Sequence, residues 1–206
     1  MKISLTNAGK RFNREWIFRH FSYSFQSGTS YAITGPNGSG KSTLLQAIAG
    51  SLELSEGSLS YEDENNRPLD SNGLQEQLAF AAPYLEVIEE FNPVELLDFH
   101  RAFKPLLPGM DAKSVLQEVG LWQHAHKQIR YFSSGMKQRV KLAQAFFSDV
   151  PVLLLDEPCT NLDADGIALY HKLIGTYTRD RVLVISSNDA QESGFCREQL
   201  SILSFK

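Results

Sequence analysis

The chain has 206 residues, and 20 Lys and Arg against 24 Asp and Glu give it a formal net charge of −4 at pH 7. This length suffices for one large domain, or for a domain with a subdomain, around a hydrophobic core. Lys and Arg form no block in the sequence, so electrostatics does not favour a nucleic acid as partner.

The sequence lacks the marks of a secreted or membrane-spanning chain. Residues 1–6 contain no apolar run that could serve as a signal peptide, and no stretch approaches the ~20 apolar residues of a spanning helix. Cys159 and Cys196 lie far apart without metal-ligand spacing, which predicts free thiols in a reducing cytosol, although one disulfide is also compatible with the sequence. We therefore expect a cytoplasmic protein, for which any membrane connection would come through a partner.

The first thirty residues predict antiparallel β structure. Residues 2–6 and 20–25 alternate apolar and polar side chains, and residues 27–28, Ser-Gly, have the composition of a turn. A further strand is expected at 57–61, and the polar run 62–66 is most simply a solvated hairpin tip.

Helical patterns dominate from Pro83 to Phe132. Asn92 is a good N-cap, Pro93 suits the first helical position, and residues 94–103 carry a helical apolar stripe. Before and after this region, strands and helices alternate, which indicates a parallel sheet interrupted by a helical insert. The expected strands are 30–34, 78–82, 152–155, 182–186 and 200–205, and the expected helices are 42–49, 94–103, 112–119, 135–147 and 165–177.

The most informative motif is Gly-Pro-Asn-Gly-Ser-Gly-Lys-Ser-Thr at 35–43, which fits the phosphate-binding pattern G-x-x-x-x-G-K-[ST]. Its glycines permit a tight turn, so several backbone N–H groups can point at one anion. Lys41 adds a positive charge for the β- and γ-phosphates, and the Ser42 hydroxyl can bind Mg²⁺. The nucleotide-binding residues expected from this loop are Gly35, Pro36, Asn37, Gly38, Ser39, Gly40, Lys41, Ser42 and Thr43.

A second motif is the apolar run 152–155 followed by Asp156, Glu157 and Pro158. A strand that is apolar on both faces belongs in the middle of a parallel sheet, and ligands sit at the carboxyl ends of such strands. There Asp156 can reach the Mg²⁺ held by Ser42, and Glu157 can orient and deprotonate an attacking water. Alone, these acids could equally be a polar transition from strand to loop; the phosphate loop upstream favours the catalytic interpretation.

Residues 131–139, Tyr-Phe-Ser-Ser-Gly-Met-Lys-Gln-Arg, resemble the signature sequence of ATP-binding-cassette (ABC) ATPases, usually written L-S-G-G-Q followed by Q-R. Ser133, Gly135, Gln138 and Arg139 match this pattern. Physically, the segment is a Ser-capped helix N-terminus that can bind an anion. The Leu, the first Gly and the Gln of the pattern are replaced by Phe132, Ser134 and Met136.

Two further segments agree with the resemblance. Residues 161–163, Asn-Leu-Asp, are similar to the D-loop of the family and imply a nucleotide contact for Asp163. Phe12 lies about where the family keeps an aromatic residue that stacks on adenine, and Trp16 is an alternative. Either ring could instead belong to the core.

The resemblance covers nearly the whole chain and implies an α/β fold. It is that of a P-loop NTPase with a RecA-like parallel sheet core, an N-terminal antiparallel β subdomain and an inserted α-helical subdomain. Residues 1–206 would form a single ABC ATPase domain. Within it, 1–30 would be the antiparallel region, 31–82 and 146–206 the P-loop core, and 83–145 the helical subdomain with the signature helix.

The resemblance also implies a function, that of the ATP-binding and ATP-hydrolysing subunit of an ABC transporter, with ATP and Mg²⁺ as cofactors. A homodimer, or a heterodimer with a second cassette, would form on two Mg·ATP, with Ser133 and Gly135 acting on the nucleotide of the other subunit. This dimer would power a separately encoded transmembrane permease. The chain resembles small single-cassette subunits such as the haem-exporter type, and its cargo is not assignable from sequence.

Two positions depart from the family pattern. Pro83 stands at or beside the usual Gln, so that the contact of this Gln with Mg²⁺ and water would be missing, replaced by water, or supplied by Glu86 or Glu89. Asn188 replaces the usual His and can donate one hydrogen bond to the γ-phosphate without carrying a charge. We expect Glu157, Lys41 and Asn188 as catalytic residues.

Some interpretations stay open at this point. A non-transport ABC ATPase acting on ribosomes or DNA usually has two cassettes, coiled-coil insertions or basic extensions, and a nucleotide-binding regulator with little turnover would agree with the two departures. His100, His124 and His126 of the helical insert are expected in surface or packing roles. The residues that could either contact a membrane partner or belong to the core are Tyr84, Leu85, Ile88 and Phe91.

Overall fold

The computed structural model describes the backbone of residues 1–206 and every side chain except that of Ser71. The strands are β1 (Lys2–Phe12), β2 (Glu15–Gln26), β3 (Ser30–Thr34), β4 (Glu56–Glu62), β5 (Pro68–Leu69), β6 (Leu78–Ala81), β7 (Val152–Asp156), β8 (Val182–Ser186) and β9 (Glu198–Ser201). The helices are α1 (Lys41–Ile48), α2 (Ser71–Glu76), α3 (Pro93–His100), α4 (Ala112–Glu118), α5 (Ser134–Phe147), α6 (Ala164–Tyr177) and α7 (Ala190–Ser193). Short 3₁₀ turns lie at Trp122–His124, Ile129–Tyr131 and Ile202–Phe205.

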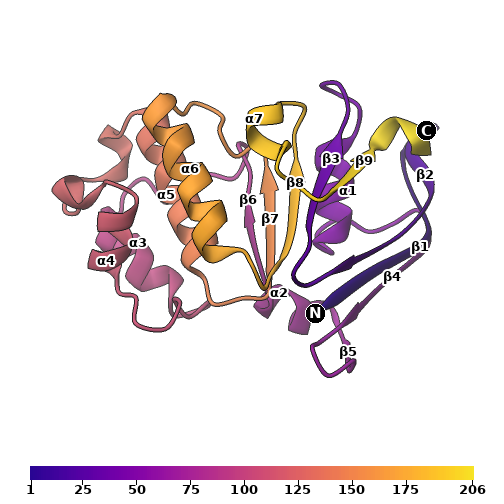
Figure 1. Cartoon of the computed structure of the whole chain (residues 1–206), viewed down its shortest axis with the longest axis horizontal. Coiled ribbons are helices and arrows are strands. Elements are labelled where there is room, and N and C mark those ends of the chain that lie inside the picture. The colour runs from indigo at the N-terminus through magenta and orange to yellow at the C-terminus, as the bar shows by residue number, and fades with distance from the viewer.

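A parallel sheet with strand order β6-β7-β8-β3-β9 stands in the middle of the molecule. Its central strands β7 and β8 are buried along their whole length, as expected for strands covered on both faces. Leu153 and Leu155 of β7 join the core formed with α3 to α6, whereas Val152 and Leu154 join the core formed with α1, β1 and β2. Helices α1 and α5 therefore cover opposite faces of this sheet (Figure 1).

The predicted α/β class is confirmed, but one boundary is wrong. Strand β4 lies within the segment 31–82 expected in the parallel core, yet it pairs with β1 in the antiparallel sheet β2-β1-β4-β5. Gly57 permits this close pairing, because its φ is +80° and a Cβ there would lie 2.2 Å from the Asn7 carbonyl oxygen. The sequence pattern identified the strand but not its partner, which lies some fifty residues earlier in the chain.

Helix α3 begins as predicted, with Asn92 as its N-cap and Pro93 at its first position. The Asn92 side chain accepts the Glu95 N–H at 3.0 Å, and the Glu95 carboxylate accepts the Asn92 N–H at 2.9 Å, a complete capping box. Helix α3 ends at His100, three residues earlier than the apolar stripe indicated. His100 has the expected packing role, since it is half-buried and its Nε2 lies 2.7 Å from Ser148 Oγ.

The C-terminal segment differs from the expected strand at 200–205. Strand β9 ends at Ser201, and the 3₁₀ turn Ile202–Phe205 follows. Ile202 is buried against Gly35, and Phe205 packs on Phe21 of the antiparallel sheet with ring centroids 4.6 Å apart, whereas Leu203 is exposed. These contacts turn the segment away from the direction of β9.

Two structural observations bear on partners and thiols. Among the residues that the structure describes, no helix is both long and apolar enough to cross a membrane. Cys159 and Cys196 are free thiols, and burial raises the pKa of Cys159 to about 12 and that of Cys196 to about 11. Both side chains are therefore protonated and unreactive at neutral pH.

Candidate nucleotide site

The glycine-rich loop between β3 and α1 is held in shape by its neighbours. Gly40 has φ +99°, and a Cβ there would lie 2.3 Å from Ile17 Cγ2, so only glycine fits. The Lys41 side chain is folded back across the loop, where its Nζ donates to the carbonyl oxygens of Gly35 at 3.0 Å and Pro36 at 3.3 Å. The loop therefore presents a compact cradle with a buried lysine, as the sequence predicted for an anion site.

Asp156 ends β7 at the same edge of the sheet. It pairs in register with Ser186 at the end of β8, and α1, which begins at the loop, packs against both strands. The Asp156 side chain is 2% exposed, and its Oδ1 has no hydrogen-bond partner among the described residues. A buried carboxylate oxygen without a partner is costly, so this position suits a cation. With the Ser42 hydroxyl it offers the oxygen ligands that Mg²⁺ prefers.

Glu157 adopts a strained backbone conformation directly after Asp156. Its φ is +42°, unusual for a residue with a side chain, and its N–H donates to the Ser186 carbonyl at 2.8 Å. Such outliers cluster at functional sites because the surrounding structure must hold them in place. The strain therefore supports the predicted role of the half-buried Glu157 carboxylate without identifying its chemistry.

Asn188 contacts the phosphate loop from the segment that follows β8. Its Nδ2 donates to Asn37 Oδ1 of the loop at 3.4 Å. The structure thus brings together two predicted site residues that are 151 positions apart in sequence.

The signature segment is anchored to residues that follow β7. Ser133 is the N-cap of α5, and its Oγ accepts the Met136 N–H at 3.2 Å. Gly135 leaves no room for a side chain, since a Cβ would lie 2.9 Å from the Asn161 carbonyl oxygen. However, α5 and α1 cover opposite faces of the parallel sheet. Ser133 and Gly135 stand at the start of α5. They are therefore on the other side of the sheet from α1, the helix that follows the phosphate loop of the same chain.

The other two predicted nucleotide contacts have different surroundings. Asp163 caps α6 by accepting the Gly166 N–H at 2.8 Å, and it also pairs with Arg139 at 3.1 Å; both interactions lower the pKa of Asp163. Its contact with a nucleotide stays a prediction. Phe12 is 48% exposed at the tip of the β1–β2 hairpin, whose Ile17 touches the phosphate loop.

Trp16, the alternative to Phe12, has a ring that is less accessible for stacking on adenine. It is half-buried, and the guanidinium groups of Arg11 and Arg19 lie 5.5 and 4.5 Å from its ring centroid. A cation also lies on Phe12, where Lys10 Nζ is 5.1 Å from the ring centroid, so the greater exposure of Phe12 is what makes it the more accessible ring.

Glu86 and Glu89, the alternatives to the missing Gln, lie beside lysines of α5. Glu89 forms an ion pair with Lys137, while burial lowers the pKa of Lys141 and the Glu86 carboxylate raises it. That one of these carboxylates replaces the Gln stays a prediction. Tyr84, which follows Pro83, accepts a hydrogen bond at its Oη from Gln46 Nε2 at 2.9 Å.

Three of the four residues proposed as partner contacts are exposed, namely Tyr84, Leu85 and Ile88. Phe91 is the exception, because it packs against the helical core and against Phe99 at 5.7 Å between centroids. A hollow of about 260 Å³ lies beside this segment, lined by β6, α5 and residues such as Leu85, His100 and Lys104.

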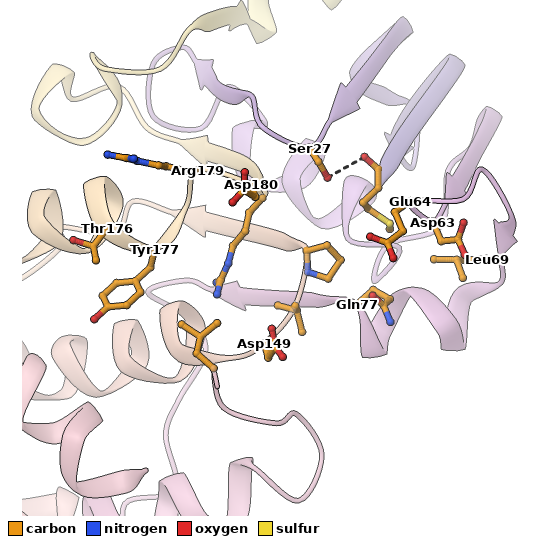
Figure 2. Close-up of a pocket in the computed structure, with 15 residues that line it drawn as sticks. Ser27, Asp63, Glu64, Leu69, Gln77, Asp149, Thr176, Tyr177, Arg179 and Asp180 are labelled. Atoms are coloured by element: carbon orange, nitrogen blue, oxygen red, sulfur yellow. Dashed lines mark hydrogen bonds between the residues drawn. The ribbon is translucent and has the colours of Figure 1, made fainter. Parts of the chain in front are cut away.

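A hollow of about 790 Å³ lies at the opposite edge of the sheet (Figure 2). Gln77, Pro151 and Arg181 line it, and each directly precedes β6, β7 or β8. The phosphate loop follows the carboxyl end of β3, so this hollow is separate from the candidate nucleotide site.

Comparison with known proteins identifies relatives along most of the chain. A family model described as "ABC transporter" matches residues 18–160. The chain is 29% identical to the uncharacterized ABC transporter ATP-binding protein YybJ of Bacillus subtilis, over 92% of this chain and 87% of that protein. It is 32% identical to the cytochrome c biogenesis ATP-binding export protein CcmA of Xylella fastidiosa, over 73% of this chain and 69% of that protein.

A solved structure has the same fold. The structure described as a dimeric bacterial ABC transporter cassette superposes with a TM-score of 0.77 at 23% identity, and the match covers 97% of this chain and 94% of that one. The family match spans more than half of the residues and includes both the phosphate loop and the acidic end of β7. This chain therefore belongs to the ABC transporter family, as one of its ATP-binding, ATP-hydrolysing cassettes.

Proposed function

We propose that this chain is a Mg²⁺-dependent ATPase subunit that closes on ATP as a dimer and drives a separately encoded membrane permease. The observation that carries the proposal is the buried, unpartnered Oδ1 of Asp156, at the sheet edge where the phosphate loop and α1 begin. A carboxylate in that state needs a cation, and Mg²⁺ accompanies ATP.

The residues of this edge divide the chemistry between them. The loop N–H groups and Lys41 hold the phosphates, and Ser42 and Asp156 would hold the Mg²⁺. The metal, when bound, neutralises negative charge on the phosphates. Glu157 takes a proton from the attacking water, and the Asn188 amide donates a hydrogen bond to the γ-phosphate.

Dimerisation follows from the separation of the two anion-binding helix ends. Because α1 and α5 cover opposite faces of the parallel sheet, the signature segment is free to meet a nucleotide held by another subunit. A triphosphate bound between the loop of one subunit and Ser133 and Gly135 of the other is neutralised from both sides. The dimeric assembly of the similar solved cassette supports this arrangement.

The membrane partner would bind beside β6 and α5. Leu85 and Ile88 are exposed next to the hollow of about 260 Å³, and Lys104 and Lys141 add positive charge to its lining. An exposed apolar patch rimmed by polar residues is typical of a protein interface. The proposal places the chain on the cytoplasmic face of a membrane through this contact. It assigns no cargo, since none of the argued contacts involves one.

The test combines two substitutions in the phosphate site. Glu157→Gln should bind ATP with wild-type affinity and dimerise, while steady-state phosphate release falls by roughly 10²- to 10⁴-fold. Lys41→Ala should lose nucleotide affinity and, with it, the dimer. Size-exclusion chromatography with and without Mg·ATP measures assembly. A Glu157→Gln variant that stays monomeric at saturating Mg·ATP would refute the dimer. If the wild-type protein releases phosphate no faster than buffer without protein, the chain is a nucleotide-binding regulator instead of an ATPase.

A further inference from the structure

Pro83, two residues after β6 ends, stands at or beside the usual Gln of the family pattern. Pro83 has neither a donor nor an acceptor in its side chain, and its carbonyl oxygen already accepts the Lys141 ammonium at 2.9 Å. The backbone carbonyl of Pro83 is therefore already hydrogen-bonded to α5.

The next residue, Tyr84, is held on the phosphate side by α1. Ser42 and Gln46 are four residues apart on this helix, so their side chains project from the same face. The Gln46 amide nitrogen donates to the Tyr84 phenol oxygen at 2.9 Å. The phenol oxygen therefore contacts the face of α1 that also carries the hydroxyl proposed to bind Mg²⁺, at the residue one turn further along the helix.

Asp156 lies at the end of the sheet where the chain leaves β6 for Tyr84. Ala81 of β6 pairs with Leu155 of β7, so the chain leaves β6 level with Asp156. Burial raises the pKa of Tyr84; the Gln46 hydrogen bond lowers it, and the Asp156 carboxylate raises it further. The electrostatic effect of Asp156 agrees with the positions of the two side chains at one edge of the sheet.

The Tyr84 hydroxyl has an unused proton. Its oxygen accepts from Gln46, and in the part of the chain that the structure describes its O–H has no acceptor. The side chain is 48% exposed, so this O–H is open to a ligand. The neighbouring residues Leu85, Glu86 and Val87 line the hollow beside α5, whereas Tyr84 does not.

From this geometry we propose that Tyr84 is a further residue of the hydrolysis site, whose O–H donates a hydrogen bond to the phosphoryl group being transferred. Gln46 is the positioning residue that fixes the phenol. The inference rests on the proposed ATP hydrolysis. A neutral donor aimed at developing charge stabilises the transition state more than the ground state.

The test compares wild type with Tyr84→Phe, which removes one oxygen and keeps the ring that packs on Phe80. Tyr177→Phe, in the lining of the hollow at the opposite edge of the sheet, is the matched control. We expect kcat of Tyr84→Phe to fall about 10- to 100-fold, with KM unchanged within about twofold. Gln46→Met should lower kcat less, and adding it to Tyr84→Phe should cause no further loss, because both act through one hydrogen bond.

A second readout does not depend on turnover. The melting temperature is measured with Mg·ADP and with Mg·ADP·vanadate, which mimics the transferring phosphoryl group. Tyr84→Phe should keep the stabilisation by Mg·ADP and lose part of the additional stabilisation by vanadate, whereas Tyr177→Phe should keep both.

Other outcomes overturn the assignment. If Tyr84→Phe retains wild-type kcat and full vanadate stabilisation, the hydroxyl has no role in hydrolysis. If the apo melting temperature and the stabilisation by both ligands fall together while the kcat of the folded protein is kept, the hydroxyl is structural. A wild-type chain that releases no phosphate looks different from either result, because it refutes the proposed ATPase itself and this inference with it.

Discussion

Replacing Gln138 with Met tests how the signature helix α5 is held to the segment that directly follows β7. Gln138 is 3% exposed in α5, and its Nε2 donates to the carbonyl oxygen of Pro158, one residue after Glu157, at 2.7 Å. Methionine keeps the length of the side chain but has no donor, so the Pro158 carbonyl loses this partner inside the protein.

The expected cost follows from this geometry. A buried acceptor left without a partner costs about 1–3 kcal/mol. For a chain of this size, 1 kcal/mol shifts the melting temperature by about 2–4 °C, so Gln138→Met should melt roughly 2–12 °C below wild type. The loss should be the same with and without nucleotide, because the hydrogen bond lies within one chain.

Differential scanning calorimetry of the apo protein measures this effect. Gln117→Met, at an exposed position of α4, is the matched control and should stay within about 0.5 kcal/mol of wild type. A Gln138→Met variant that melts within about 1 °C of wild type would contradict the reasoning, since it would mean that the Pro158 carbonyl finds another partner at little cost.

Two further predictions concern the adenine contact and the pH dependence of stability. Phe12→Ala should weaken binding of a fluorescent ATP analogue by roughly 5- to 100-fold through loss of stacking, whereas Trp16→Ala should leave affinity within about twofold; the reverse order would assign the adenine contact to Trp16. Burial, and then Lys104, lower the pKa of His100, so the unfolded chain binds its proton at higher pH than the folded chain does. The stability contributed by His100 is thus full above about pH 6.5 and is lost as pH falls below it, and His100→Gln should reduce the loss of unfolding free energy between pH 7.5 and 5.5 in urea titrations. An unchanged pH slope in His100→Gln would assign the acid sensitivity to other groups.

Several site features could be read directly from short stretches of sequence. The glycine loop, the acids at the end of β7, and the caps at Asn92 and Ser133 each depend on residues within a few positions of one another. Their conformations follow from turns and helix ends, which local backbone hydrogen bonding controls. Helix and strand positions followed for the same reason, with ends that shifted by a few residues where tertiary packing intervened, as at His100 and Ser201.

Other features depend on which distant segments meet. Nothing near Glu86 or Glu89 in sequence indicates that α5 supplies the lysines facing them, and nothing near Tyr84 indicates that Gln46 holds its hydroxyl. These contacts arise from the register of β6 on β7 and from the face of the sheet that each helix covers.

The sequence by itself determined the chemistry that this protein carries: a phosphate cradle, an acidic strand end and a capped signature helix. Only the tertiary structure decided that β4 joins the antiparallel sheet, that α1 and α5 lie on opposite faces of the parallel sheet, and that the Tyr84 hydroxyl accepts a hydrogen bond from Gln46 of α1. The physical reason is range: capping and turn geometry are set within about four residues, whereas strand pairing and packing join residues tens of positions apart.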